Sequence, residues 1–338
     1  MPTPISHYGA DLTGLIWAYV FSADGDSRAL RPADTEEWLA APDNAAGEFI
    51  WLHCNLAHAG TENWLRRHLT LSDQFYETLH EGTRSTRIDH ADGALIAVLN
   101  DVLFDFSFDA SDIATLWLSV DARVVVTART HPLRSVDMLR EAVKKGERLR
   151  SPVELLMHLL RDEADVLVQI VRDIATRVDS IEDRLLGSHI GNGRSQLGNF
   201  RRLLVRLQRL LAPEPSALFR LLNRPPAWVQ ERDVLELRQS TEEFSTALSD
   251  MTALQERIKL LQEEIAATIN EQNNRSLFVL TTVSVLALPI NMIAGLFGMN
   301  VGGIPLAEDS AGFWIVVAIV ATFTVMAGKL LFRGRHEP

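Results

Sequence analysis

Asparagine, serine and threonine recur at helical spacing through an otherwise apolar segment near the C-terminus. Reading back from Asn291 in steps of seven gives one series of positions, and a second series interleaves with it. The two series are Asn291, Ser284, Leu277, Asn270, Glu263 and Glu256, and Leu288, Thr281 and Asn274. Residues at these spacings share one face of an α-helix. The neutral oxygens could contact a partly hydrated cation, Leu277 and Leu288 could constrict its path, and the glutamates could concentrate cations at the inner end. The pattern predicts a pore-lining face.

Polar side chains at membrane depth are costly unless they face water or a partner, which favours the pore interpretation. A second interpretation stays open, in which Ser284 and Thr281 bond back to their own helix and Asn291 compensates for the backbone hydrogen bond lost at Pro289. A separate apolar row at three- and four-residue spacing predicts the face that packs against neighbouring helices. This row is Met251, Leu254, Ile258, Leu261 and Ile265.

Immediately after this segment the chain reads Gly298-Met299-Asn300, followed by a loop whose charged residues are Glu308 and Asp309. On the pore interpretation Met299 is a further apolar constriction and Asn300 lies at the outer mouth. Neither apolar segment of this region contains His or Cys. A tight zinc site needs several such ligands or carboxylates, so any ion site inside the pore is expected to be weak and hydrated.

The close grouping of soft metal ligands is His53, Cys54 and His58, at the end of a predicted strand and in the following loop. Alternation along the strand sends His53 and Cys54 to opposite faces, so they are not expected to share a metal ion. Ordinary packing or surface roles and a regulatory zinc site both stay open for this group.

Catalytic motifs are absent from the sequence: there is no P-loop, no Gly-x-Gly-x-x-Gly after a strand, no His-Glu-x-x-His and no Gly-x-Ser-x-Gly. The chain is therefore not expected to be an enzyme or to need a cofactor. Without a nucleotide-binding loop, transport would draw on ion gradients or on the membrane potential.

Two segments are long and apolar enough to cross a bilayer, residues 277–297 and 313–332. The connecting loop, residues 301–312, has two acids and no base, whereas Arg275, Lys329, Arg333 and Arg335 flank the other ends. The positive-inside rule then places both termini in the cytoplasm and the loop outside. The alternative is a buried hairpin in a soluble protein. Because two helices cannot enclose a water-filled path, transport requires several copies of the chain.

The remainder of the chain predicts two cytoplasmic parts. Residues 1–228 favour a mixed α/β domain, a sheet covered by helices, with strands at 15–21, 49–53, 95–99, 115–120 and 124–127. Helices are expected around 34–39 and 72–79 and over long stretches from 132 to 211. Residues 229–276 predict a stalk helix continuous with the first membrane helix, and residues 277–338 the membrane domain. No proline or glycine interrupts the chain between Pro226 and Pro289.

Composition excludes some classes of partner. The formal net charge of -11 argues against nucleic acid, because a binder must neutralise phosphates with clustered Lys and Arg. A single cysteine cannot form an intramolecular disulfide. The N-terminus lacks a basic stretch followed by an apolar run, so no signal peptide is expected.

The Gly298-Met299-Asn300 signature, placed at the end of the first of two C-terminal spans after a long charged helix, resembles the CorA superfamily of divalent-cation transporters. The resemblance implies a funnel-shaped homopentamer of the inner membrane, with a pore lined by the first transmembrane helix. It also implies that Gly298 and Asn300 form part of the outer selectivity site and that Glu308 and Asp309 attract cations.

Within that superfamily, Gly302-Gly303 and Pro305 after the signature look like the zinc-transporting ZntB branch. This likeness implies zinc as the transported ion and a link between zinc movement and protons. A magnesium, cobalt or nickel channel of the same architecture is the alternative. A further alternative, of another class, is a membrane-anchored scaffold or sensor that uses the long helix only for oligomerisation.

Overall fold

A computed structural model describes residues 13–41, 47–81, 86–109, 111–186, 193–299 and 311–333. The chain divides into two compact units, Met1–Gln262 and Glu263–Pro338. The division falls within the long helix α8, Glu231–Phe297, which therefore contributes to both units. Each unit is described by itself.

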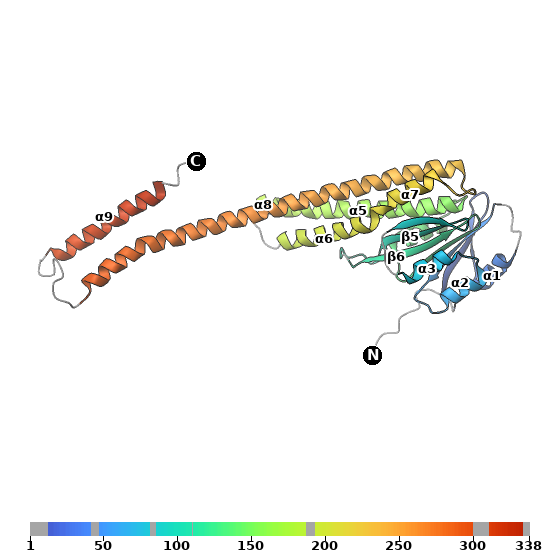
Figure 1. The fold of residues 1–338 in the computed structure, drawn as a ribbon, viewed down its shortest axis with the longest axis horizontal. Coiled ribbons are helices and arrows are strands. Elements are labelled where there is room, and N and C mark those ends of the chain that lie inside the picture. The colour runs from blue at the N-terminus through green and yellow to red at the C-terminus, as the bar shows by residue number, and fades with distance from the viewer. Residues whose placement is uncertain are drawn as a thin grey trace. The chain divides into compact units, whose positions relative to one another are not determined.

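The N-terminal unit is built on a mixed seven-stranded sheet (Figure 1). Across the sheet the strands are β2 (Ser27–Leu30), β1 (Leu15–Phe21), β3 (Phe49–Asn55), β7 (Val124–Arg129), β6 (Ile113–Val120), β5 (Ala94–Val102) and β4 (Arg87–Ala91). Neighbouring strands are antiparallel except β3 and β7, which are parallel. A parallel pair needs a long crossover, and the segment from α2 to β6 provides it.

Helices cover both faces of this sheet because its strands are apolar on both sides. One face carries α1 (Pro32–Ala40), α2 (Thr61–His68) and α3 (Asp73–His80), and the other carries α4 (Arg134–Lys144), α5 (Pro152–Leu186), α7 (Pro213–Asn223) and the start of α8. Side chains along β3 alternate between the two cores: Trp51 joins the second, whereas Ile50 and Leu52 join the first. The predicted fold, a mixed sheet covered by helices, is confirmed.

All five predicted strands are present, and Ser72 caps α3 by accepting a hydrogen bond from the Phe75 N–H at 3.3 Å. Strands β2 and β4 and helices α2 and α7 were not predicted from the sequence. The Asp92-Gly93 pair joins β4 to β5 with φ values of 52° and 82°. Positive φ at both positions is what a two-residue hairpin turn of this kind requires. The Asp92-Gly93 pair in the sequence therefore indicates a hairpin turn, and with it the strand β4 that precedes β5.

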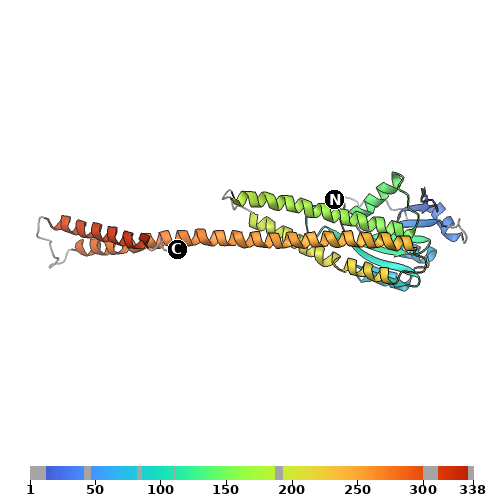
Figure 2. The same cartoon turned by 90° about the horizontal axis from the view of Figure 1, so that it is seen from above.

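Two long helices, α5 and α6 (Gly193–Leu211), flank the first part of α8 (Figures 1 and 2). Arg257 of α8 forms ion pairs with Asp179, at 2.7 Å, and with Glu182, both on α5. Gln208 of α6 donates a hydrogen bond to Thr252 Oγ1 at 2.9 Å. The predicted apolar row of α8 is buried, each of its five side chains being at most 6% exposed, so that prediction is confirmed.

The C-terminal unit consists of the remainder of α8, which ends at Phe297, and of α9, Gly312–Arg333. The first expected membrane span coincides with the end of α8, and the second with α9. Pro289 lies inside α8, where it removes one backbone donor from the helix.

Candidate functional site

The final turns of α8 expose apolar side chains in every direction around the helix axis. Eight large apolar residues between 277 and 296 are more than half exposed: Leu277, Val279, Leu280, Val283, Val285, Leu288, Met292 and Leu296. Among the described residues, α8 is the one helix that is long and apolar enough to cross a membrane by length and composition. In water such a surface would be strongly unfavourable, whereas hydrocarbon accommodates it.

Helix α9 is also apolar, from Gly312 to Ala327. Phe313 and Trp314 at its start are 70% and 71% exposed, and their rings contact each other edge-to-face. Aromatic residues of this kind suit the interface between hydrocarbon and headgroups. The two helices together therefore present the surface of a membrane domain.

The predicted pore-lining residues are all exposed on a single chain. Asn270, Asn274, Leu277, Thr281, Ser284, Leu288 and Asn291 belong to this set, and so do Glu256 and Glu263 nearer the N-terminus of the helix. At about 100° per residue they fall within an arc of roughly 100° of the helix circumference. The buried apolar row lies on a different side. One continuous face of α8 thus carries these polar, acidic and leucine side chains and is not covered by this subunit.

Hydrogen bonding separates the two interpretations of this face only in part. Ser284 Oγ donates to the Leu280 carbonyl at 2.9 Å, as the alternative interpretation expects. Within the described part of the chain the side chain of Asn291 has no hydrogen-bond partner, so it does not compensate there for the bond lost at Pro289. No hydrogen bond in the described residues explains why Asn291 is polar.

Gly298 directly follows α8 and has little space around its Cα. Its N–H donates to the Ala294 carbonyl at 2.9 Å, and an added Cβ would lie 3.1 Å from that same oxygen. A side chain here would therefore press on the last turn of the helix. Met299 follows and is 51% exposed. Asn300, Glu308 and Asp309 lie outside the described residues.

The His53, Cys54 and His58 group does not converge. Cys54 is buried in the core beneath α1–α3, and His53 is buried on the other face of the sheet, where it stacks on Trp17 at 4.1 Å. Both ring nitrogens of His53 are occupied, by Thr127 Oγ1 and by Arg129 Nε, each at 2.8 Å. The Nδ1 atom of His58 accepts a hydrogen bond from the Gly60 N–H at 3.2 Å. These three side chains serve packing and loop structure.

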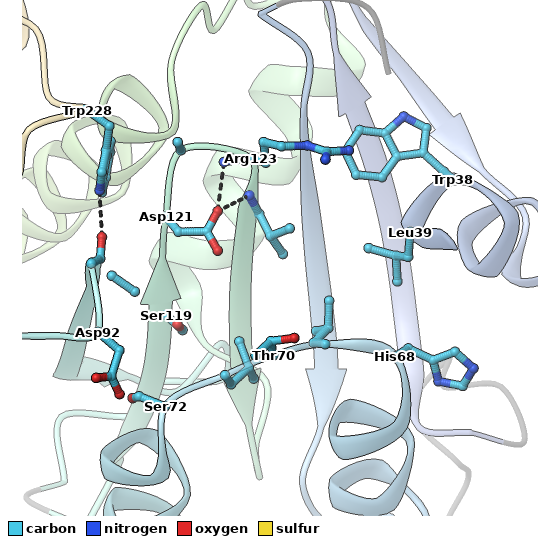
Figure 3. A pocket seen from close by; sticks show the side chains of 16 residues that line it. Trp38, Leu39, His68, Thr70, Ser72, Asp92, Ser119, Asp121, Arg123 and Trp228 are labelled. Carbon is cyan, nitrogen blue, oxygen red and sulfur yellow. Dashed lines mark hydrogen bonds between the residues drawn. The ribbon is translucent and has the colours of Figure 1, made fainter. Parts of the chain in front are cut away.

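No cluster of three or more His, Cys, Asp or Glu side chains that could hold a metal ion occurs in the described ranges. A cavity of about 430 Å³ near the hairpin ends of the sheet is lined by Trp38, Trp228 and Arg123 among others (Figure 3). Its polar groups hold turns: Asp121 accepts the N–H groups of Arg123 and Val124 at 2.7 Å, and Trp228 Nε1 donates to the Gly93 carbonyl at 2.7 Å. The uncovered face of α8 is the stronger candidate for function.

Known proteins resemble this chain over most of its length. The model of the family described as CorA-like Mg2+ transporter protein matches residues 46–333. A relative named divalent cation transporter CmaX, from Pseudomonas aeruginosa, is 29% identical over 326 residues, which cover 94% of this chain and 96% of the relative. The zinc transport protein ZntB of Yersinia enterocolitica is 25% identical over 277 residues, or 82% of each chain.

Solved structures show the same fold. The structure of full-length CmaX matches with a TM-score of 0.81 and 28% identity, covering 95% of this chain and 99% of that chain. The complete structure of the CorA magnesium transporter from Methanocaldococcus jannaschii matches with a TM-score of 0.76 over 93% of this chain and 96% of that chain, at 17% identity. The likeness therefore extends over both units.

Proposed function

The chain belongs to the CorA family and is a membrane protein of divalent-cation transport, and from this premise we propose that it moves zinc through a pore lined by α8. The observation that carries the proposal is the uncovered face of Asn291, Ser284, Thr281 and their neighbours on the uncharged C-terminal part of α8, residues 277–297. An anchor that only holds a scaffold in the membrane needs no polar residue at this depth.

The pore itself requires several copies of the chain, and the proposal takes five, arranged around an axis. Leu277, Leu288 and Met299 then form apolar constrictions, with Asn291 between the second and third of them along the chain. Gly298 and Asn300 form the outer mouth, Glu308 and Asp309 attract cations to it, and Glu263 concentrates cations at the inner end. The membrane is the inner membrane, with both termini in the cytoplasm.

Zinc is supported by the residues after Asn300 and by similarity to proteins named for zinc transport. The CmaX relative, whose name specifies only divalent cations, covers more of the chain at higher identity. A magnesium, cobalt or nickel channel is accordingly the second candidate. Since described helices α8 and α9 contain no His or Cys after residue 231, either ion would pass with part of its hydration shell.

Flux measurements distinguish these candidates. The purified full chain is placed in sealed vesicles containing a zinc-sensitive or a magnesium-sensitive dye, and the matching ion is added outside with and without an inward proton gradient. Proton-linked zinc transport predicts zinc entry that increases with the gradient. Magnesium entry that ignores the gradient would support the channel candidate. Vesicles that admit no divalent ion would contradict transport and favour the scaffold.

A further inference from the structure

A groove between α6 and α8 is lined by four arginines and by no carboxylate. Its volume is about 540 Å³, and it lies within the N-terminal unit. The lining residues are Arg201, Arg202, Arg206 and Arg209, with Gly198 and Val205 from the same helix and Gln262 from α8. A row of like charges on one helix face is unfavourable unless counter-charges approach it.

The described part of the chain supplies no ion pair to these four arginines. Arg201 and Arg202 donate hydrogen bonds to the neutral side chains of Gln262 and Asn199. Arg206 Nε is buried without a hydrogen-bond partner in the described residues. Arg206 interacts electrostatically with Asp109 without an ion pair, so in a chain of net charge -11 the groove is a positively charged site that its own subunit compensates only in part.

The opposite flank of α8 has the complementary character. Glu256, Leu260 and Glu264 are spaced four residues apart, so they form one row along the helix, and all three are exposed. Leu260 is 63% exposed, an unusual position for an aliphatic side chain in the cytoplasmic part of the helix. At about 100° per residue, Leu260 and Gln262 point to opposite sides of α8. We refer to these three residues as the acidic row.

Rotational symmetry places the groove and the acidic row at the same level. If identical subunits are arranged around an axis roughly parallel to α8, each residue keeps its height along that axis. The acidic row lies within about 9 Å of Gln262 along the helix, at 1.5 Å per residue. A neighbouring copy would therefore bring its row to the height of the groove without any shift.

We infer that the arginine groove of one subunit receives the acidic row of the next, in a head-to-tail contact that repeats around the ring. The glutamates neutralise the arginines, and Leu260 packs on Val205, which is 46% exposed in the single chain. A small anion would satisfy the arginines but would leave both aliphatic side chains in water. This inference rests on the proposed multi-subunit pore and names the surfaces that close it.

Disulfide trapping tests the contact in the full chain in native membranes. The variant Val205→Cys/Leu260→Cys is oxidised mildly and run on a non-reducing denaturing gel; the native Cys54 is buried and stays in all variants. A head-to-tail ring predicts a ladder of adducts that extends beyond the dimer. Each single variant is expected to give no ladder. The matched control is Val205→Cys/Leu235→Cys, because Leu235 is equally exposed, at 64%, but about 38 Å along the helix from Leu260.

Charge reversal provides the second test. Arg201→Glu/Arg202→Glu should weaken assembly about tenfold, because it places acid against acid, and adding Glu256→Arg/Glu264→Arg should restore it. Assembly is measured as protein mass by light scattering. A double-cysteine protein that still assembles but yields no ladder would overturn the contact. If the same double-cysteine protein carries divalent ions after reduction, the proposed function still holds although the contact is wrong. If the wild-type protein shows no divalent-ion flux, the proposed function is wrong, whether or not the gel shows a ladder.

Discussion

At the scale of single residues, His53 illustrates how neighbours decide a role. Arg129 Nε can only donate a hydrogen bond, so His53 Nε2 must accept it and the ring proton lies on Nδ1, facing Thr127 Oγ1. Burial, together with the positive charges of Arg129 and Arg140, holds the pKa of His53 well below its usual range. A neutral histidine in this network is a structural residue, and its placement leaves no nitrogen for zinc.

Asp101 is a buried carboxylate that the sequence analysis did not single out. It accepts hydrogen bonds from the Val102 and Ser135 N–H groups at 2.7 and 2.8 Å and from the Ser135 hydroxyl at 2.5 Å. Ser135 lies in the first turn of α4, so Asp101 ties the end of β5 to that helix. Burial raises the pKa of Asp101 to about 6, in spite of these hydrogen bonds.

This shift predicts a pH dependence of stability. Between its ordinary pKa and about 6, Asp101 binds a proton in the folded state but not in the unfolded state. Its contribution to the free energy of unfolding is therefore present at low pH and lost as pH rises through 6. Asp101→Asn should remove this component, so the stability difference between wild type and variant changes across that interval. Thermal unfolding in detergent at several pH values measures it.

The control for this experiment is Asp165→Asn, which changes an exposed carboxylate on α5. Its stability difference from wild type should stay nearly constant over the same pH interval. If the unfolding temperatures of wild type and Asp101→Asn changed in parallel with pH, Asp101 would not titrate in this range.

At the scale of the element, the two parts of helix α8 have different surroundings. Its N-terminal part buries an apolar row against α5 and α6, whereas its C-terminal part exposes apolar side chains all around and one polar face. Side chains of like character recur at the same helical period in both parts, so one uninterrupted helix can present both surfaces. The polar face stays uncovered because neither α5 nor α6 packs on that side.

Removal of the polar groups from this face tests the pore assignment. Thr281→Leu/Ser284→Leu/Asn291→Leu should decrease divalent-ion flux at least about tenfold, equivalent to roughly 1.4 kcal/mol, because an apolar lining no longer solvates the ion. Val279→Leu/Val283→Leu enlarges exposed side chains on the other side of the same helix and should leave flux nearly unchanged. Flux is measured in dye-loaded vesicles at equal protein content. If the triple variant kept the flux of the wild type, the assignment of α8 to the pore lining would be wrong.

At the scale of the whole molecule, the chain is an α/β unit and a membrane unit that share α8. Basic residues lie before the first apolar segment and at the end of the second, whereas the connecting loop carries acids. That distribution favours a loop outside and both termini inside.

Cysteine labelling tests this orientation. Ala307→Cys places a thiol in the connecting loop, and Ala253→Cys places one at an exposed position on the cytoplasmic part of α8. A membrane-impermeant maleimide should label Ala307→Cys in intact cells and Ala253→Cys only after the membrane is opened. The wild-type chain, with its buried Cys54, serves as the unlabelled control. The reverse pattern would invert the proposed topology.

The sequence by itself determined the features that depend on local periodicity and length. The absence of proline and glycine between Pro226 and Pro289 predicted α8, and the absence of charge between 277 and 297 predicted its membrane part. Short β-rich runs bounded by turn signals predicted five strands. Alternation also placed His53 and Cys54 on opposite faces. Short edge strands such as β2, with only four residues, carry too few alternations to be recognised, and β4 depended on the Asp92-Gly93 turn.

Only the tertiary structure decided which residues meet across the chain. The pairing of β3 with β7 brings Thr127 and Arg129 to His53 across more than 70 residues of sequence, and no local pattern encodes that contact. The arginine groove likewise exists because α6 packs beside α8, which converts a charged helix into one wall of a concave surface. Local periodicity selects the elements, whereas burial and charge between distant segments select their partners.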